Sequence, residues 1–368
     1  MQKKTTGILR GINMSTHNIA VIRGDGIGIE VVEEGLKVLT AVSANYDFEL
    51  KFTELPWSSE YYKKHGEMMP SDGLDTLKQF DSIFLGAVGH PDIQDHITLN
   101  GLLLPIRRGF DQYVCERPST LFPGITSPLA NKNPYDIDMV VIRENTEGEY
   151  ANVGGFQYLD FPEEIGIQTG IFTKKGCERV IRYAFQLAEK RNKKKHVTSI
   201  TKSNAQGYGM IVWDRAFENV STEFPNISTS SLLIDAAAMD FIRKPEIFDV
   251  VVGSNLFGDI LTDIGAIISG SMGLASSANL DPQKRYPSMF EPVHGSAPDI
   301  MGQGIANPMA QILTGAMMLR HLGNDYAALD IENAVTKLLE SKDMLTPDLG
   351  GTASTQQVGS AVVNALGK

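Results

Sequence analysis

DVVVGSNLFGDILTD, residues 249–263, joins a strand pattern to a helix pattern. The valine run 250–252 is continuous and apolar, as in a parallel strand that is buried on both faces. After a Gly-Ser-Asn break, apolar residues recur at helical spacing and place Asp259 and Asp263 on one helix face. Like charges at this spacing repel each other unless a cation lies between them, and oxygen ligands suit Mg²⁺ or Mn²⁺. The pair therefore fits either a divalent-metal site or a solvated acidic face.

Length and composition are those of a globular protein. A chain of 368 residues is long enough for roughly two domains or one large α/β unit. The 44 acidic residues against 33 Lys and Arg give a net charge of -11, which argues against general binding to nucleic acids or anionic membranes. Cys115 and Cys177 form no disulfide or metal pattern, so a reducing, cytoplasmic location is expected. No apolar run approaches the ~20 residues of a membrane helix.

Strand patterns alternate with helix patterns along the chain, which predicts a parallel α/β sheet with ligands at the strand ends. Residues 1–13 lack an apolar core and are expected to be a leader, a tag or an alternative start, with the first strand beginning at Ile19. GDGIG, residues 24–28, is neither GxGxxG nor a Walker motif, so a phosphate cradle and a tight turn both stay open. Residues 151–170 are rich in glycine, acids and aromatics and predict a protruding loop or arm.

Charged side chains follow the ends of several predicted strands. In an acidic protein, arginines at these positions indicate carboxylate binding, although each alone also fits a surface ion pair. Lys202 and Asp235 likewise stand where strands are expected to stop, which is where α/β sites lie. The arginines are Arg107, Arg117 and Arg143.

Seven motifs occur in order from about residue 19 to the C-terminus: GDGIG, RENTEGEY, TKSN, NLFGDILTD, EPVHGSAPDI, GIANP and TPDLGGTAST. Together they resemble the β-decarboxylating dehydrogenases, which include isocitrate, isopropylmalate, homoisocitrate and tartrate/D-malate dehydrogenases. RENTEGEY and the segment FDQYV…RP are most similar to the tartrate/D-malate branch. The resemblance implies a two-domain, isopropylmalate dehydrogenase-like α/β fold, not a Rossmann domain, with the active site in the cleft between the domains. Residues 14–112 and 271–368 would form the large NAD-binding domain, and 113–270 the small domain with a dimerisation arm.

The same resemblance implies roles for individual residues in a homodimer whose active sites are shared between protomers. Asp259 and Asp263 of one protomer and Asp235 of the other would bind Mg²⁺ or Mn²⁺. Tyr150 and Lys202 of the partner subunit would be the acid–base pair. The substrate would be bound by Arg107, Arg117, Arg143, Leu103 and Leu104. NAD would be bound by Glu291, His294, Gly295, Ser296, Ala297, Asp299 and Asn307. A requirement for K⁺ is compatible with the family.

These residue types suit oxidation and then decarboxylation of a (2R)-hydroxy acid. Lys202 would accept the hydroxyl proton, which requires a neutral amine although the reference pKa of lysine is about 10.4. A divalent ion would stabilise the developing negative charge on the substrate oxygens. After CO₂ leaves, Tyr150 would protonate the enolate. Asp299 favours NAD over NADP, because an acid near the adenosine ribose repels a 2′-phosphate.

Residues near position 100 bear on the choice of substrate. Isocitrate-using relatives carry Ser and Asn at the positions of Gly101 and Leu103, so a third carboxylate would meet apolar groups here. D-Malate and tartrate are therefore expected, while Leu103 and Leu104 keep 3-isopropylmalate as the alternative. Asn100 replaces the Trp that is usual in the tartrate/D-malate branch and predicts a wider or more polar pocket. A catalytically silent regulatory subunit is disfavoured, because the metal aspartates and the acid–base pair are all present.

Overall fold

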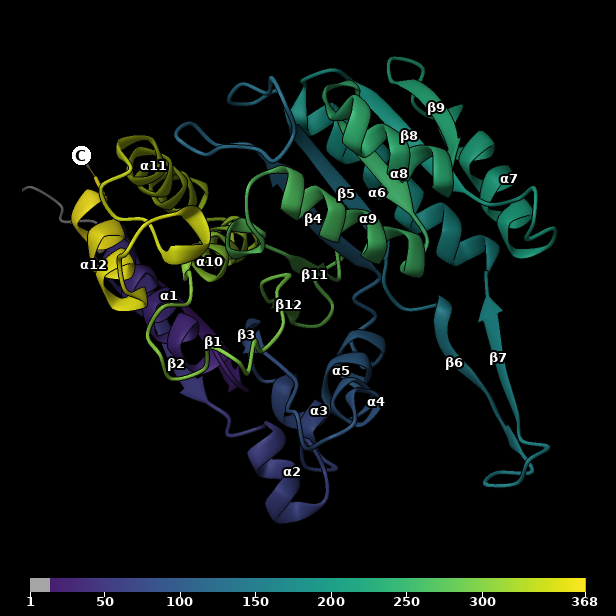
Figure 1. The fold of residues 1–368 in the computed structure, drawn as a ribbon, viewed down its shortest axis with the longest axis horizontal. Helices are drawn as coiled ribbons and strands as arrows, with labels where there is room; N and C mark the ends of the chain where they lie inside the picture. Colours follow the sequence, from purple (N-terminus) through teal and green to yellow (C-terminus); the bar gives the residue numbers. More distant parts are fainter. Residues whose placement is uncertain (1–13, 368) are drawn as a thin grey trace, which may run out of the picture.

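The computed structural model describes residues 14–367, so the expected leader at 1–13 lies outside the described residues. A ten-stranded sheet packed against helices forms the body of the protein, and a two-stranded hairpin projects from it (Figure 1). The strands are β1 (Ser15–Gly24), β2 (Phe48–Glu54), β3 (Ser82–Ala87), β4 (Val114–Thr120), β5 (Asp138–Glu144), β6 (Gly148–Gln157), β7 (Ile165–Ile171), β8 (His196–Thr201), β9 (Ser228–Leu233), β10 (Val250–Gly253), β11 (Ala278–Leu280) and β12 (Ser288–Phe290). The helices are α1 (Gly28–Ser43), α2 (Ser59–His65), α3 (Gly73–Leu77), α4 (Asp95–Thr98), α5 (Leu104–Gly109), α6 (Lys174–Arg191), α7 (Gly209–Ser221), α8 (Ile234–Arg243), α9 (Asn255–Ile268), α10 (Met309–His321), α11 (Asp325–Ser341) and α12 (Thr355–Ala365).

The large sheet is mixed, and the prediction of a parallel sheet is wrong for its middle. Its order is β2-β1-β3-β12-β11-β4-β5-β10-β8-β9. The outer strands pair in parallel, but β4 runs antiparallel to both β5 and β11, and β11 runs antiparallel to β12. Parallel neighbours need a crossover, usually a helix, whereas residues 121–137 between β4 and β5 contain no helix. The chain therefore returns beside β4 in the opposite direction.

Helices cover the sheet in separate groups. Helices α1, α10, α11 and α12 pack together near β1 and β3, α6 and α7 pack beside β5, β8 and β10, and α8 and α9 pack together with α9 against β5 (Figure 1). The valine run in β10 is completely buried, as its continuous apolar pattern predicts. Pairing of β11 with β4 joins the sequence groups 14–112 plus 271–368 and 113–270. The division of the chain into these two domains stays a prediction.

The expected protruding segment at 151–170 is an antiparallel hairpin of β6 and β7 (Figure 1). It carries large apolar side chains into solvent: Phe156 is 68% exposed and Phe161 is 66% exposed. Tyr158, Leu159 and Ile167 are also more than half exposed. A two-stranded hairpin with no covered face has little stability of its own, so this arm needs a further surface to bury it.

Two predicted boundaries are wrong. β1 begins at Ser15 instead of Ile19, because its polar first residues pair in parallel with β2 from the register Ser15↔Phe48. Asp235 does not end a strand: β9 stops at Leu233, and Asp235 lies in the first turn of α8, where a carboxylate interacts favourably with the helix dipole. Within residues 14–367, no helix is both long enough and apolar enough to cross a membrane.

Candidate active site

Asp259 in α9 is the point on which side chains from three strands converge. Its Oδ1 accepts hydrogen bonds from Nη1 of Arg117 at 3.1 Å and from Nη1 of Arg143, and its Oδ2 accepts the hydroxyl of Tyr150 at 2.9 Å. Burial alone would raise the pKa of Asp259, but the guanidinium groups of Arg143 and Arg117 hold it below its usual value. Asp259 is therefore a carboxylate, and the two arginines and the tyrosine predicted for the site lie together around it.

Arg143 is held in place by residues of the helix that carries Asp259. Its side chain is 2% exposed, and Oδ1 of Asn255 accepts from its Nε at 3.0 Å and from its Nη2 at 2.8 Å. Gly258 lies against it, because a Cβ at this position would come within 2.6 Å of the Arg143 Cβ. The glycine in NLFGD thus has a packing reason, and Asn255, the first residue of this motif, positions Arg143.

The two α9 aspartates fit a divalent cation that takes further ligands from elsewhere. Burial and, next, the negative charge of Asp259 raise the pKa of Asp263, a repulsion that a bound cation would offset. In the described part of the chain, no group of three or more His, Cys, Asp and Glu side chains could hold a metal ion. Mg²⁺ commonly binds one or two carboxylates and keeps water or substrate oxygens as its other ligands. The donor set is thus chemically suitable but incomplete within one chain.

Lys202 and Asp235 form a pair of their own. The Lys202 Nζ lies 2.6 Å from Oδ1 of Asp235, which is 60% exposed. Lys202 directly follows β8, as predicted, while Asp235 opens α8. Among residues 14–367, no hydrogen bond or ion pair joins this pair to the cluster around Asp259. One chain therefore brings the predicted base and the predicted third metal ligand into contact with each other.

Arg107 belongs to a buried polar network that links the predicted substrate and cofactor regions. Its Nη2 donates to Oε1 of Glu291 at 2.5 Å, and Nδ2 of Asn279 donates to the same oxygen at 2.8 Å. Asn145 continues the network by donating from its Nδ2 to Oδ1 of Asn279 at 2.9 Å. The Nε atoms of Arg107 and Arg117 are buried and have no partner within the described residues. Each is a buried donor whose hydrogen bond the described residues leave unmade.

The GDGIG motif proves to be a tight turn pressed against the predicted NAD loop, residues 291–299. Gly26 has φ +56°, and a Cβ there would lie 2.0 Å from the carbonyl oxygen of Ser296. That same oxygen accepts the amide of Ile27 at 2.8 Å. Asp25 fixes the turn by accepting from the amide of Gly89 at 2.9 Å and from Ser59. The sequence allows GDGIG to be a phosphate cradle or a tight turn. A tight turn is sufficient to explain the glycines, because they allow the close approach of two backbones.

Several features of the NAD loop fit a bound cofactor. His294 hydrogen-bonds through Nδ1 to the carbonyl oxygen of Gly295 at 3.0 Å, while its Nε2 is buried without a partner among the described residues. Burial lowers the pKa of His294, which favours the neutral imidazole. Because Nδ1 donates to the Gly295 carbonyl, Nε2 carries no hydrogen and can accept a hydrogen bond. Ala297 has φ +39°, an unusual conformation for a residue with a side chain. Asp299 is exposed, as recognition of a ribose would require.

Asn307 is buried and is held by the TPDLGG motif. Its Nδ2 donates to Oδ2 of Asp348 at 3.1 Å, and its Oδ1 accepts the amide of Met309 at 3.0 Å. Asp348 also accepts the hydroxyl groups of Ser271 and Thr346, each at 2.5 Å. The TPDLGG motif thus positions Asn307 through Asp348, a role that the sequence analysis does not predict.

The predicted specificity residues lie in and after a π-helical turn at Leu99–Leu103. Turns of this kind are frequent at functional sites. Leu103 is 7% exposed and packs in a buried cluster with Trp57 and Met68, whereas Leu104 is partly exposed. The Nδ2 of Asn100 donates to the carbonyl oxygen of His96 at 2.8 Å. The specificity roles of these residues stay predictions, with Leu104 offering more apolar surface than Leu103.

Nearly the whole chain is similar to a family of dehydrogenases. Residues 18–362 match the isocitrate/isopropylmalate dehydrogenase family. The chain is 52% identical over 354 residues to a probable tartrate dehydrogenase/decarboxylase of Agrobacterium vitis, covering 96% of this chain and 97% of the relative. It is 50% identical to a tartrate dehydrogenase/decarboxylase of Pseudomonas putida, covering 95% and 98%. It is 49% identical to a decarboxylating D-malate dehydrogenase of Escherichia coli K12, covering 96% and 99%.

The fold gives the same result. The crystal structure of isocitrate dehydrogenase from Methylococcus capsulatus matches with a TM-score of 0.85 and 34% identity, covering 95% of this chain and 99% of that one. The predicted isopropylmalate dehydrogenase-like α/β fold and the resemblance to the tartrate/D-malate branch are thereby confirmed. This chain belongs to the isocitrate/isopropylmalate dehydrogenase family and is a decarboxylating dehydrogenase.

Proposed function

We propose that this protein catalyses the NAD-dependent oxidative decarboxylation of a small (2R)-hydroxy dicarboxylic acid, D-malate to pyruvate and CO₂, with tartrate as a further substrate. The observation that carries the proposal is the cluster of Arg117, Arg143 and Tyr150 on Asp259, next to the unpaired Nε donors of Arg107 and Arg117. Guanidinium groups are suited to planar carboxylates, of which such a substrate has two. The relatives named for tartrate and D-malate support this substrate class.

When substrate binds, its carboxylates replace the Asp259 carboxylate as hydrogen-bond acceptors of Arg117 and Arg143. Without substrate, Asp259 occupies donors of both Arg117 and Arg143. A dicarboxylate takes over these donors and the orphaned Nε atoms, and this releases the Asp259 oxygens. Divalent-cation binding and substrate binding therefore favour each other, because a cation neutralises Asp259 and Asp263 as their arginine partners turn to the substrate.

Two side chains of the protein move the protons. Lys202 of the partner subunit takes the hydroxyl proton of the substrate, and Tyr150 donates a proton to the carbon that loses CO₂. Burial and the neighbouring Asp259 carboxylate raise the pKa of Tyr150, so this phenol stays protonated at neutral pH and is a proton donor. When bound, NAD⁺ accepts the hydride and a Mg²⁺ or Mn²⁺ ion polarises the substrate oxygens.

The functional unit is a homodimer. Among residues 14–367 no group of three or more ligand side chains could hold a metal ion, and Lys202 and Asp235 pair with each other rather than with the arginine cluster. Helices α8 and α9 expose large apolar side chains, as does the β6–β7 arm. The exposed helix residues are Met239, Ile242, Ile260 and Ile267. A second copy that covers α8, α9 and the arm brings the pair of Lys202 and Asp235 to the neighbouring site and buries these surfaces.

Mixing two inactive variants tests whether sites are shared. Tyr150→Phe and Lys202→Ala are each expected to be nearly inactive as pure dimers. After the subunits are exchanged, half of the dimers are mixed and each mixed dimer contains one intact site, so about a quarter of the wild-type activity returns. If no activity returned although mixed dimers formed, each site would be built from one chain and the dimer proposal would be wrong.

The substrate proposal is tested by measuring NADH or NADPH formation with D-malate, L-tartrate, meso-tartrate, 3-isopropylmalate and isocitrate. The assay contains Mn²⁺ and is run with and without K⁺, and kcat/KM is the quantity compared. D-Malate or tartrate with NAD⁺ should lead by about tenfold or more, equivalent to about 1.4 kcal/mol. A preference for NADP⁺ would contradict the assignment made from Asp299.

3-Isopropylmalate is the second candidate substrate. The observation in its favour is Leu104, which is apolar, partly exposed and directly follows the π-helical turn. In the same assay, a lead for 3-isopropylmalate that disappears in Leu104→Ser would establish this alternative. The same substitution should leave kcat/KM for D-malate within about threefold, because D-malate has no alkyl branch to contact this position.

A further inference from the structure

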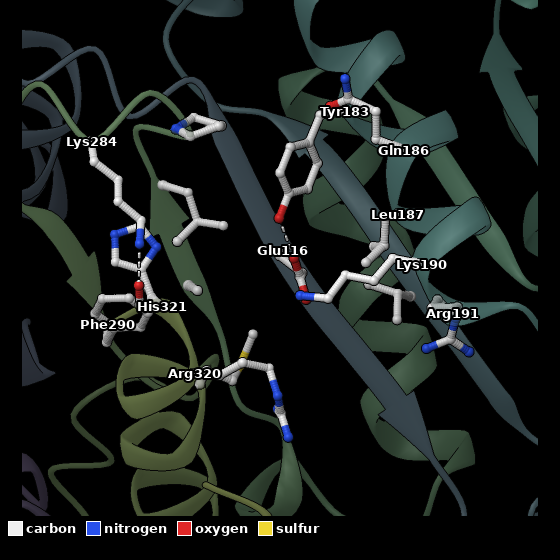
Figure 2. Close-up of a pocket in the computed structure, with 15 residues that line it drawn as sticks. Glu116, Tyr183, Gln186, Leu187, Lys190, Arg191, Lys284, Phe290, Arg320 and His321 are labelled. Atoms are coloured by element: carbon white, nitrogen blue, oxygen red, sulfur yellow. Dashed lines mark hydrogen bonds between the residues drawn. The ribbon is translucent and has the colours of Figure 1, made fainter. Parts of the chain in front are cut away.

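Strand β4 contributes Arg117 to the cluster around Asp259, here called the reaction site, on one face of the sheet. On the other face it contributes Glu116 to a separate cavity. Successive side chains of a strand point to opposite faces, so Arg117 reaches Asp259 while Glu116 points away from it. Glu116 lines a cavity of about 530 Å³, which lies between α6, α10 and the sheet (Figure 2). We call it the rear cavity. Its volume is within the range of pockets that hold small organic ligands.

The sheet register explains why the floor of the rear cavity is apolar. Glu116 pairs with Ala278, and Ala278 pairs with Phe290, so these side chains share the face opposite the reaction site. The floor and walls are formed by Val140, Leu187, Ala278, Leu280, Phe290 and Met317. Such a surface can bury the apolar part of a ligand.

Cations surround this floor in a protein whose net charge is -11. Arg320 is paired with Glu332 at 2.7 Å, and Arg191 with Asp249 at 3.0 Å, so both are neutralised. Among the described residues, neither Lys190 nor Lys284 forms an ion pair with a carboxylate, although the charge of Lys190 acts on the carboxyl of Glu116. The Lys284 Nζ donates to the backbone carbonyl of His321 at 2.6 Å, which leaves its positive charge in place.

The other titratable groups of the rear cavity include Glu116, Tyr183 and His321. Glu116 accepts the hydroxyl of Tyr183 at 2.7 Å, and burial raises the pKa of the Glu116 carboxyl (Figure 2). Burial and, next, the charge of Lys284 lower the pKa of His321 to about 4, so its imidazole is neutral at physiological pH. Two ammonium groups without an ion-pair partner among the described residues thus flank an apolar floor that also carries the Tyr183–Glu116 hydrogen bond.

We propose that the rear cavity binds a small organic anion with an apolar body, an alkyl or aryl carboxylate or phosphate ester. The anionic group lies between Lys190 and Lys284, and the apolar body lies on the floor around Leu187 and Phe290. The site is independent of the reaction site, because the two are on opposite faces of the sheet and share no side chain. Its lining comes both from 113–270 and from 271–368, so a bound anion bridges these two parts of the chain.

Calorimetric titration of the full-length protein with defined probes tests this site. The probes are 4-phenylbutanoate, phenyl phosphate, inorganic phosphate and neutral 4-phenylbutan-1-ol, each in excess D-malate without cofactor, so that the reaction site is occupied and no turnover occurs. Lys190→Glu reverses the free charge, and Leu187→Trp fills the floor. Lys175→Glu is the matched control, because Lys175 is an exposed lysine on α6 outside the cavity.

The wild type and Lys175→Glu should bind at least one of the two aryl anions more tightly than inorganic phosphate and the neutral alcohol. The aryl anion that binds with the lower Kd shows whether the site prefers a carboxylate or a phosphate ester. Lys190→Glu should weaken this binding by about tenfold or more, and Leu187→Trp should abolish it. The proposal is overturned if neither aryl anion binds, or if Lys190→Glu binds as tightly as Lys175→Glu.

Discussion

Replacing Asn255 by alanine should damage catalysis through Arg143 without touching a reacting atom. Both side chains are buried, and the Asn255 Oδ1 accepts two hydrogen bonds from the guanidinium group. Its Nδ2 donates to the carbonyl oxygen of Glu147 at 3.1 Å, which holds the amide in this orientation. Alanine removes the acceptor and leaves two N–H groups of a buried cation without a partner.

The size of the effect follows from these contacts. A hydrogen bond to a charged group contributes roughly 1.5–3 kcal/mol, and the two bonds to one oxygen are not additive, so the total loss is about 3 kcal/mol. If this loss falls on the orientation of Arg143 toward substrate, kcat/KM decreases by roughly a hundredfold, since each factor of ten corresponds to about 1.36 kcal/mol.

Initial rates of NADH formation with D-malate measure kcat/KM, and thermal unfolding measured in parallel reports whether the variant is folded. Asn255→Asp is the matched control, because it keeps an acceptor oxygen of nearly the same shape and should stay within about tenfold of the wild type. The reasoning is refuted if Asn255→Ala is folded and keeps kcat/KM within about threefold of the wild type.

Three further outcomes are expected. Gly26→Ala should raise KM for NAD⁺ by about tenfold or more, because its Cβ would clash with the Ser296 carbonyl; Gly66→Ala, at φ +77° but in open space, should lower only Tm. Burial raises the pKa of Glu144 from 4.5 to about 7, so the folded state holds an extra proton between these values. The free energy of unfolding should then fall as pH rises through that window, and less so in Glu144→Gln, as thermal unfolding at several pH values would reveal. EDTA should abolish NADH formation and Mg²⁺ or Mn²⁺ should restore it; full activity in EDTA would exclude a metal role for the α9 aspartates.

Local sequence patterns predicted the parts of this protein that depend on neighbouring residues. The valine run of β10, the spacing of Asp259 and Asp263 on α9, and the position of Lys202 after β8 are all found in the structure. Asp235 is predicted at the end of a strand but lies in α8, because β9 and α8 adjoin without a turn signal between them. The mixed sheet was missed because strand direction depends on the connection, and residues 121–137 lack the helix that a parallel return needs.

The positioning residues could not be read from local patterns. Asn255 and Arg143 are 112 residues apart, and Arg107 and Glu291 are 184 residues apart. Their hydrogen bonds exist only after the sheet has brought distant segments together, and no helical or strand period encodes such pairs. Family motifs do mark some of these positions, since Glu291 is expected near the cofactor, but they do not show that it accepts a hydrogen bond from Arg107, a predicted substrate residue.

The alternation of Glu116 and Arg117 along β4 restricts how this strand can change during evolution. Inserting or deleting one residue before it would exchange the two faces, placing a carboxylate beside Asp259 and a guanidinium in the apolar floor of the rear cavity. A point substitution alters one face, whereas a single-residue indel reverses both. Natural length variation in this enzyme should therefore be confined to the connection at 121–137 and absent from 111–120, and engineered insertions should follow the same division.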